Sequence, residues 1–166
     1  MLFFTACATV MPAPRNAEDA VISGRLSLRV EAIGSEPARS FSAAFDLRGD
    51  ARSGTLGLST PLGNLLAEAR WSAAEVTLTT PQGTRAFADL DGLTREVLGE
   101  SVPVEAWFDW LRGRPWPAAP SVPRAGDGFE QLGWSVDVAR LPEGRVSALR
   151  EQPRPQVTVR IQLDES

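Results

Sequence analysis

The sequence lacks three side chains on which much protein chemistry depends: histidine, lysine and tyrosine. Without histidine among the 166 residues, Ser-His-Asp and Cys-His catalysis and the common histidine-containing zinc sites are excluded. All 17 basic residues are arginines, and 21 acidic residues leave a net charge of -4, so no global basic field attracts nucleic acid. P-loop, GxGxxG and CxxC motifs are also absent. We therefore expect no enzyme, cofactor, metal or nucleic-acid partner, and an enzyme built on paired carboxylates remains the alternative.

Cysteine occurs once, so no intrachain disulfide can form. This residue, Cys7, follows a short apolar run and comes directly after Ala6, an arrangement typical of a lipid-attachment site. A secretory signal needs an apolar region of about 7–15 residues, so we expect that the translation start lies further upstream or that the chain was trimmed. The division expected is a residual signal segment over 1–7 and a flexible tether over 8–20. The alternative is an apolar N-terminus with a chance cysteine.

Alternating apolar and polar residues begin at Val21 and predict strands with one buried face. The apolar members are Leu26, Leu28, Val30, Phe41, Ala43, Phe45, Leu47, Leu56, Leu58, Leu65, Ala67, Ala69, Trp71, Val76 and Leu78. Turns such as Arg48–Gly54 separate the segments. The pattern predicts about six antiparallel strands up to residue 88, within a single domain over 21–166.

The hydrophobic period then changes to that of a helix over Leu90–Leu98, with Gly99 as a suitable end. A second helix is predicted to start near Pro103 and to end at Gly113. Residues 115–123 are rich in proline and are expected to be irregular, and strands return over 129–138 and 157–163.

Strands interrupted by two helices indicate an α+β domain with an antiparallel sheet. If that sheet is strongly curved, the amphipathic helices can cover its apolar concave face as a lid. A conventional closed core produces the same pattern, so both arrangements remain open from the periodicity. No segment reaches the 18–20 apolar residues of a membrane helix, and attachment to a membrane would therefore use an anchor.

Several short motifs occur in a distinctive order between Gly24 and Leu163. They are Thr60-Pro61-Leu62-Gly63, Leu98-Gly99, Val102-Pro103-Val104, Trp110-Leu111-Arg112-Gly113, Gln131-Leu132-Gly133-Trp134 and Leu141-Pro142. With a cysteine near the N-terminus, this order resembles the LolB family of outer-membrane lipoprotein receptors. One departure is that Asp46 or a neighbour stands where the family often has tryptophan.

The resemblance implies a half-barrel of about eleven antiparallel strands, with helices over a hydrophobic cavity. It implies that the protein accepts the acyl chains of lipoproteins from the periplasmic carrier LolA and inserts them into the outer membrane, where Cys7 anchors it. The family's leucine for membrane insertion, in a Pro-Leu-Gly loop, corresponds to Leu62. From the residues alone, the favoured interpretation of Leu62 is an ordinary exposed apolar side chain.

The candidate cavity-lining residues belong to the apolar faces of the strands and helices. They are Leu28, Phe41, Phe45, Leu58, Leu78, Leu93, Val97, Trp107, Trp110 and Trp134, and ordinary core packing is the alternative for each. Arg112 and Arg114 are candidates for carrier docking or cations that stabilise a helix end. A monomer is expected. The alternative function is a lipid-binding or structural outer-membrane lipoprotein without transfer activity.

Overall fold

The computed structural model describes residues 21–165, which form one antiparallel sheet and two short α-helices. The strands are β1 (Ile22–Val30), β2 (Arg39–Gly49), β3 (Gly54–Ser59), β4 (Leu65–Trp71), β5 (Val76–Thr80), β6 (Gly83–Phe87), β7 (Ser121–Arg124), β8 (Gly128–Gln131), β9 (Trp134–Asp137), β10 (Arg145–Arg150) and β11 (Val157–Leu163). The helices are α1 (Leu90–Leu98) and α2 (Val104–Trp110), with a 3-10 turn η2 at Leu141–Glu143. Within the described residues, neither helix is long and apolar enough to cross a membrane.

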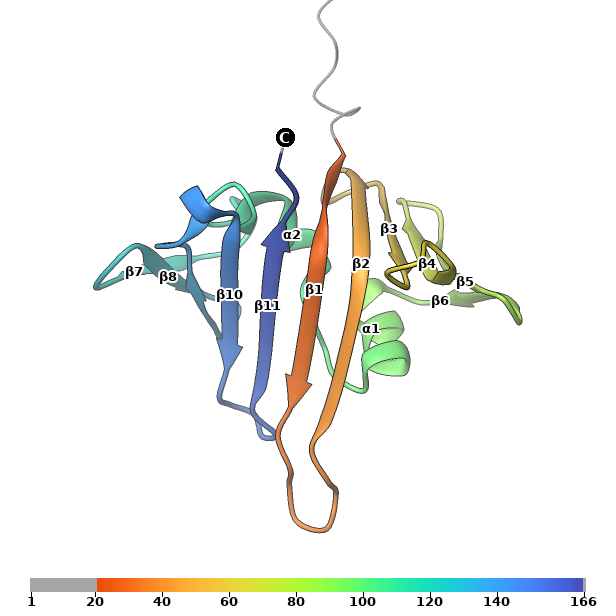
Figure 1. Cartoon of the computed structure of the whole chain (residues 1–166), viewed down its shortest axis with the longest axis horizontal. Helices are drawn as coiled ribbons and strands as arrows, with labels where there is room; N and C mark the ends of the chain where they lie inside the picture. Colours follow the sequence, from red (N-terminus) through yellow and green to blue (C-terminus); the bar gives the residue numbers. More distant parts are fainter. Residues whose placement is uncertain (1–20, 166) are drawn as a thin grey trace, which may run out of the picture.

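The sheet has eleven strands in the order β6-β5-β4-β3-β2-β1-β11-β10-β9-β8-β7 and does not close, because β6 and β7 remain edges. The first and last strands pair at its centre, and the sheet curves around both helices, which lie behind it in Figure 1. The expected α+β half-barrel of about eleven strands is confirmed.

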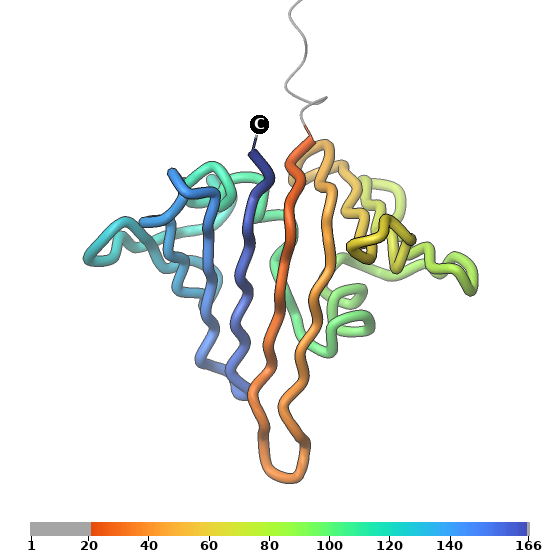
Figure 2. The backbone as a smooth tube through the Cα atoms, viewed as in Figure 1, coloured from red at the N-terminus to blue at the C-terminus, as the bar shows by residue number. Residues whose placement is uncertain are grey.

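Alternation of side chains across each strand decides which face is buried. In the central pairs, Leu26 lies opposite Ala43 and Ile161, and Leu28 lies opposite Phe41. The apolar rows face the helices, whereas the residues between them, such as Arg25, face outward. Figure 2 traces this continuous ribbon of strands, with the helical segment beneath its inner face.

The first helix begins and ends where the sequence predicts. The Asp89 side chain accepts a hydrogen bond from Gly92 N at 2.7 Å, which satisfies one of the free amides of the first turn. Gly99 ends α1 in the left-handed conformation, with φ of 75°, and its amide donates to Arg95 O. The second helix ends at Trp110, earlier than predicted, and Gly113 closes the turn that follows it.

Three predictions for the C-terminal half need correction. Residues 129–138 form the β8–β9 hairpin rather than one strand, because Leu132 and Gly133 both adopt positive φ, 54° and 78°, as a tight hairpin turn requires. Part of the segment expected to be irregular forms β7, since an edge strand tolerates Pro123. Strand β10 was not predicted, because the buried position Arg150 interrupts its apolar alternation.

Candidate functional site: an apolar cavity beneath two helices

The concave face of the sheet and the two helices enclose an apolar cavity. Its lining residues are Leu26, Leu28, Phe41, Leu56, Leu58, Ala67, Ala69, Leu78, Leu90, Leu93, Thr94, Val97, Leu98, Val104 and Trp107. The free space is only about 30 Å³, enough for one or two water molecules. The side chains therefore nearly fill the cavity in this conformation, and an acyl chain needs additional space.

The lining residues come from distant parts of the chain, and strand and helix periodicity decides which side chains of each element face the cavity. Leu58 and Leu78 point inward because alternate residues of β3 and β5 share one face. On α1, Leu93 and Val97 are four residues apart and therefore lie on the same side of the helix. Trp107 comes from α2 and is only 3% exposed.

Seven of the ten predicted lining residues contact this cavity: Leu28, Phe41, Leu58, Leu78, Leu93, Val97 and Trp107. Phe45, Trp110 and Trp134 are instead buried elsewhere in the core. The indole N–H of Trp110 donates to Gln131 Oε1 at 2.8 Å. The Arg150 guanidinium lies over the Trp134 ring, with its Cζ 5.6 Å from the ring centre. Whether any of the ten touches an acyl chain stays a prediction.

The lining also includes residues that the prediction omitted: Leu26, Leu56, Ala67, Ala69, Leu90, Thr94, Leu98 and Val104. Most belong to the same alternating faces and could have been chosen from them. The exception is Thr94, a polar residue only 3% exposed. Its hydroxyl donates to Asp91 O at 3.1 Å and accepts from Val102 N at 3.2 Å, so the lining keeps its apolar character.

The two helices differ in how firmly they are held. In α2, every residue except Glu105 is buried, whereas α1 buries only Leu90, Leu93 and Thr94. Burial raises the pKa of Glu105, and the nearby charges of Asp91 and Asp89 act in the same direction. The second helix is therefore part of the core, and α1 is the cover with less buried surface.

An ion pair fixes the linker between the helices to the sheet. Arg150 of β10 is 7% exposed, and its Nη2 lies 2.6 Å from Glu100 Oε2. Arg150 Nη1 also donates to Ser101 O at 3.3 Å. The start of the linker is thus held to the sheet, whereas α1 itself buries only Leu90, Leu93 and Thr94.

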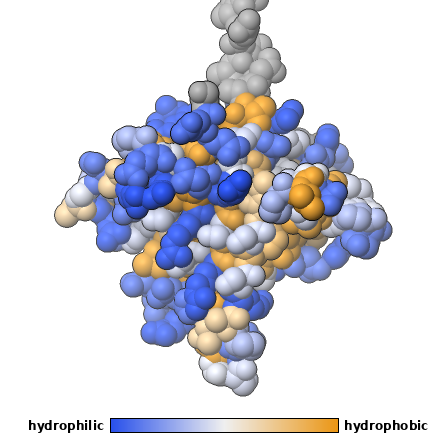
Figure 3. Space-filling model, in the orientation of Figure 1, coloured by the Kyte–Doolittle hydropathy of each residue, from blue (hydrophilic) through white to orange (hydrophobic). Residues whose placement is uncertain are grey.

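The loop between β3 and β4 presents an apolar side chain to solvent. Leu62 is 89% exposed, and an apolar patch stands over this loop in Figure 3. Thr60 closes the loop: its amide donates to Asn64 O at 2.9 Å, and its carbonyl accepts from Gly63 N at 2.9 Å. Leu62 is therefore displayed by a compact turn that prevents it from packing against the sheet.

The two arginines after α2 interact with the helix that precedes them. Arg112 Nη1 donates to Phe108 O, and Arg114 Nε lies 2.6 Å from Asp109 Oδ1. These contacts support their interpretation as helix-end cations. The other predicted site residue, Cys7, lies outside the described residues.

An open antiparallel half-barrel with an apolar interior beneath two helices defines a class of protein suited to enclosing apolar chains. The family model described as "Outer membrane lipoprotein LolB" matches residues 19–165, and the chain belongs to this family.

Several relatives carry the name outer-membrane lipoprotein LolB. The protein of Bordetella petrii is 33% identical, covering 96% of this chain and 85% of its own length. That of Cupriavidus metallidurans is 32% identical, with 81% and 71% covered. That of Chromobacterium violaceum is also 32% identical, with 78% and 69% covered. The resemblance found in the motifs is thereby confirmed.

Proposed function

We propose that this chain is an outer-membrane lipoprotein receptor, which accepts lipoproteins from a LolA-type periplasmic carrier and inserts them into the outer membrane. The observation that carries the proposal is the apolar cavity beneath α1 and α2 in a member of the LolB family. Its relatives are named as outer-membrane lipoproteins, which supports the same location for this chain, facing the periplasm. The family is one of lipoprotein localisation rather than of enzymes.

Acceptance of cargo requires the cavity to expand. Each buried CH₂ group of an acyl chain contributes about 0.8 kcal/mol, so a chain that enters can offset the loss of packing around α1. The free space of about 30 Å³ means that Leu93 and Val97 must move away from the sheet. We propose that α1 moves outward, with Trp107 remaining as the wall on the α2 side, and that the seven predicted lining residues contact the acyl chains.

Delivery needs a group that favours contact with the bilayer, and Leu62 has the required exposure. Leu65 and Leu66 of β4 are also partly exposed, by 47% and 36%, so the loop leads into further apolar surface. Burial of a leucine contributes about 1.5–3 kcal/mol. Insertion of Leu62 into the lipid interface therefore favours close contact between the loaded receptor and the bilayer.

The remaining parts of the proposal concern residues 1–20 and the partners. We propose that Cys7 is the acylated residue at the end of a signal segment over 1–7, and that 8–20 form a tether to the domain over 21–166. The receptor acts as a monomer with one carrier, because each transfer step moves one cargo. Transfer requires only that the affinity for the acyl chains increases from the carrier to the receptor and from the receptor to the bilayer. Each tenfold preference corresponds to only about 1.4 kcal/mol.

A transfer assay tests this proposal with the full chain carrying Cys7→Ser, which removes the anchor. The protein is mixed with a LolA-type carrier holding labelled lipoprotein, and liposomes are then added. We expect the Cys7→Ser protein to take the cargo and insert it, and a further Leu62→Glu substitution to allow uptake but prevent insertion. Val122→Glu, at another exposed apolar residue (64%), is the matched control and should insert normally. Failure of the Cys7→Ser protein to take cargo would contradict the receptor function.

A further inference from the structure

The outer face of the sheet carries a groove of about 530 Å³, on the side opposite the helices, in which arginine and serine side chains stand among apolar surface. Its floor is formed by two neighbouring rows of outward residues across β2, β1, β11 and β10. One row is Ser42, Ser27, Arg160 and Ser147, and the next is Ala44, Arg25, Gln162 and Arg145. Pro61 of the β3–β4 loop forms one wall, and Asp137 and Arg140 form the other.

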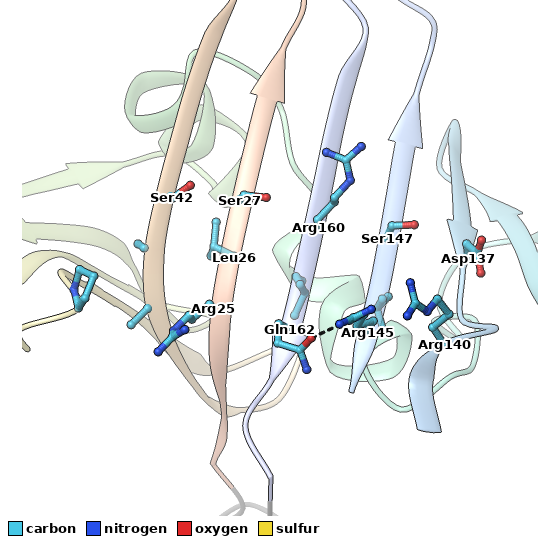
Figure 4. A pocket seen from close by; sticks show the side chains of 15 residues that line it. Arg25, Leu26, Ser27, Ser42, Asp137, Arg140, Arg145, Ser147, Arg160 and Gln162 are labelled. Atoms are coloured by element: carbon cyan, nitrogen blue, oxygen red, sulfur yellow. Dashed lines mark hydrogen bonds between the residues drawn. The ribbon is translucent and has the colours of Figure 1, made fainter. Parts of the chain in front are cut away.

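Positive charge dominates this groove although the whole chain has a net charge of -4. Four arginines line it, against a single acidic residue, Asp137. Figure 4 shows these side chains together, with Arg145 held by a hydrogen bond to Gln162 Oε1 at 3.0 Å. The Asp137 carboxylate accepts a hydrogen bond from Ala139 N at 2.9 Å and forms no ion pair with an arginine within residues 21–165.

Two of the four arginines have no acidic partner within residues 21–165. Arg140 and Arg145 share Glu143, at 2.6 and 3.6 Å, whereas Arg25 and Arg160 form neither an ion pair nor a side-chain hydrogen bond in this part of the chain. Because Arg25 pairs with Gln162, it is the diagonal neighbour of Arg160, at about 7–8 Å between backbones. Figure 4 shows the two side chains extending away from each other on this face, so each guanidinium is available to a separate anionic group.

We propose that this groove binds the phosphates of phospholipid headgroups and sets the outer face of the sheet against the membrane. Guanidinium groups bind phosphate oxygens through paired hydrogen bonds, and the hydroxyls of Ser27, Ser42 and Ser147 add further donors. The ligand class is the phosphodiester of a lipid rather than an acidic protein, because the groove wall continues directly into an apolar tip. Pro61 lines the groove, and its neighbour Leu62 is 89% exposed.

Cations beside an exposed apolar side chain match the two layers of a membrane interface, where phosphates lie above acyl chains. Leu62 enters the acyl layer while Arg25 and Arg160 reach the headgroups. This inference deepens the proposed delivery function and rests on it. The groove orients the receptor at the bilayer, whereas the cavity accepts the cargo.

Vesicle flotation tests the proposal with the full chain carrying Cys7→Ser. The vesicles contain phosphatidylethanolamine and phosphatidylglycerol in equal amounts, or digalactosyl diacylglycerol, which has no phosphate. We expect binding to the phospholipid vesicles and much weaker binding to the galactolipid vesicles. Neutralising Arg25→Gln and Arg160→Gln together should weaken phospholipid binding roughly 30-fold, at about fivefold for each arginine. Added salt should weaken the binding of the parent protein more than that of the variant.

The matched control is Arg52→Gln with Arg154→Gln, which removes the same charge at two exposed arginines that lie outside the groove and form no ion pair within residues 21–165. The control should bind as the parent does. Equal binding by both double variants, or equal binding to the two kinds of vesicle, would overturn the proposal. If the Arg25/Arg160 variant binds vesicles normally but no longer takes cargo from the carrier, the groove recognises the carrier instead. Cargo uptake by the parent protein separately reports on the receptor function.

Discussion

The ion pair between Arg150 and Glu100 provides a stability prediction that can be worked out from the structure. The two side chains are 8% and 15% exposed, and their charged atoms are 2.6 Å apart. Replacing Glu100 by alanine leaves a buried guanidinium without its counter-ion. Breaking a buried pair in this way costs about 3–5 kcal/mol, and we expect a value near 3 kcal/mol because Glu100 retains some contact with water.

The reciprocal substitution should cost less. Arg150→Met keeps an apolar stem of similar length, and the remaining Glu100 has a second cation nearby, Arg39 Nη2 at 3.8 Å. In the double variant neither charge is left unpaired, and replacement of a whole buried pair by apolar residues is often close to neutral. Moreover, Arg150 Nε has no hydrogen-bond partner within residues 21–165, so the native pair itself is not fully satisfied.

Urea unfolding of the four proteins gives the free energy of unfolding of each and closes the cycle. We expect the double variant to be more stable than Glu100→Ala and a coupling energy of about 2 kcal/mol or more. Two results would refute the reasoning: a loss below about 1 kcal/mol for Glu100→Ala, or a double variant whose loss equals the sum of the single losses. Either result would mean that solvent already screens the pair.

Two further predictions concern the cavity and pH. Ala69→Phe places a phenyl group into a space of about 30 Å³, so it should lower stability by about 1–3 kcal/mol and block uptake of labelled lipoprotein, whereas Ala86→Phe, at an exposed position, should do neither. Burial raises the pKa of Glu105, which means that its charged form is disfavoured in the folded state. Glu105→Gln should therefore raise the free energy of unfolding at neutral pH, and this gain should disappear below pH 4.5, the ordinary pKa of glutamate. Urea unfolding at neutral pH and at a pH below 4.5 tests this. An equal gain at the two pH values would contradict burial of the charge as the cause.

The sequence predicted the elements whose hydrophobic period is strong. Six strands up to Phe87, helix α1 and β11 agree with their alternating or helical patterns. The wrong predictions lie where a single residue, rather than a repeated pattern, decides the local structure. The positive φ of Leu132 makes a hairpin within an apparently continuous strand, and Arg150 occupies a buried strand position that a polarity pattern assigns to solvent.

The cavity could be predicted only in part, for a related physical reason. Periodicity identifies the buried face of each element but not which buried residues lie beside a space and which fill the core. The apolar pattern predicts Trp110 and Trp134 in the lining, yet they lie elsewhere in the core, where Trp110 donates to Gln131 and the Arg150 guanidinium lies over the Trp134 ring. Small residues such as Ala67 and Ala69 line the cavity, because short side chains are what leave room for it.

The two proposed working surfaces are opposite faces of the same central strands, so strand register couples them. Leu26 and Leu28 line the cavity, whereas the intervening Ser27 and the preceding Arg25 line the groove. Since alternate residues point to opposite faces, a slip of β1 by one residue would place arginine inside and leucine outside. Neither surface could then form, and the pairing of β1 with both β2 and β11 prevents such a slip by fixing its register on two sides. The same strand pairing that stabilises the sheet thus keeps the apolar cavity and the arginine-lined groove on opposite faces.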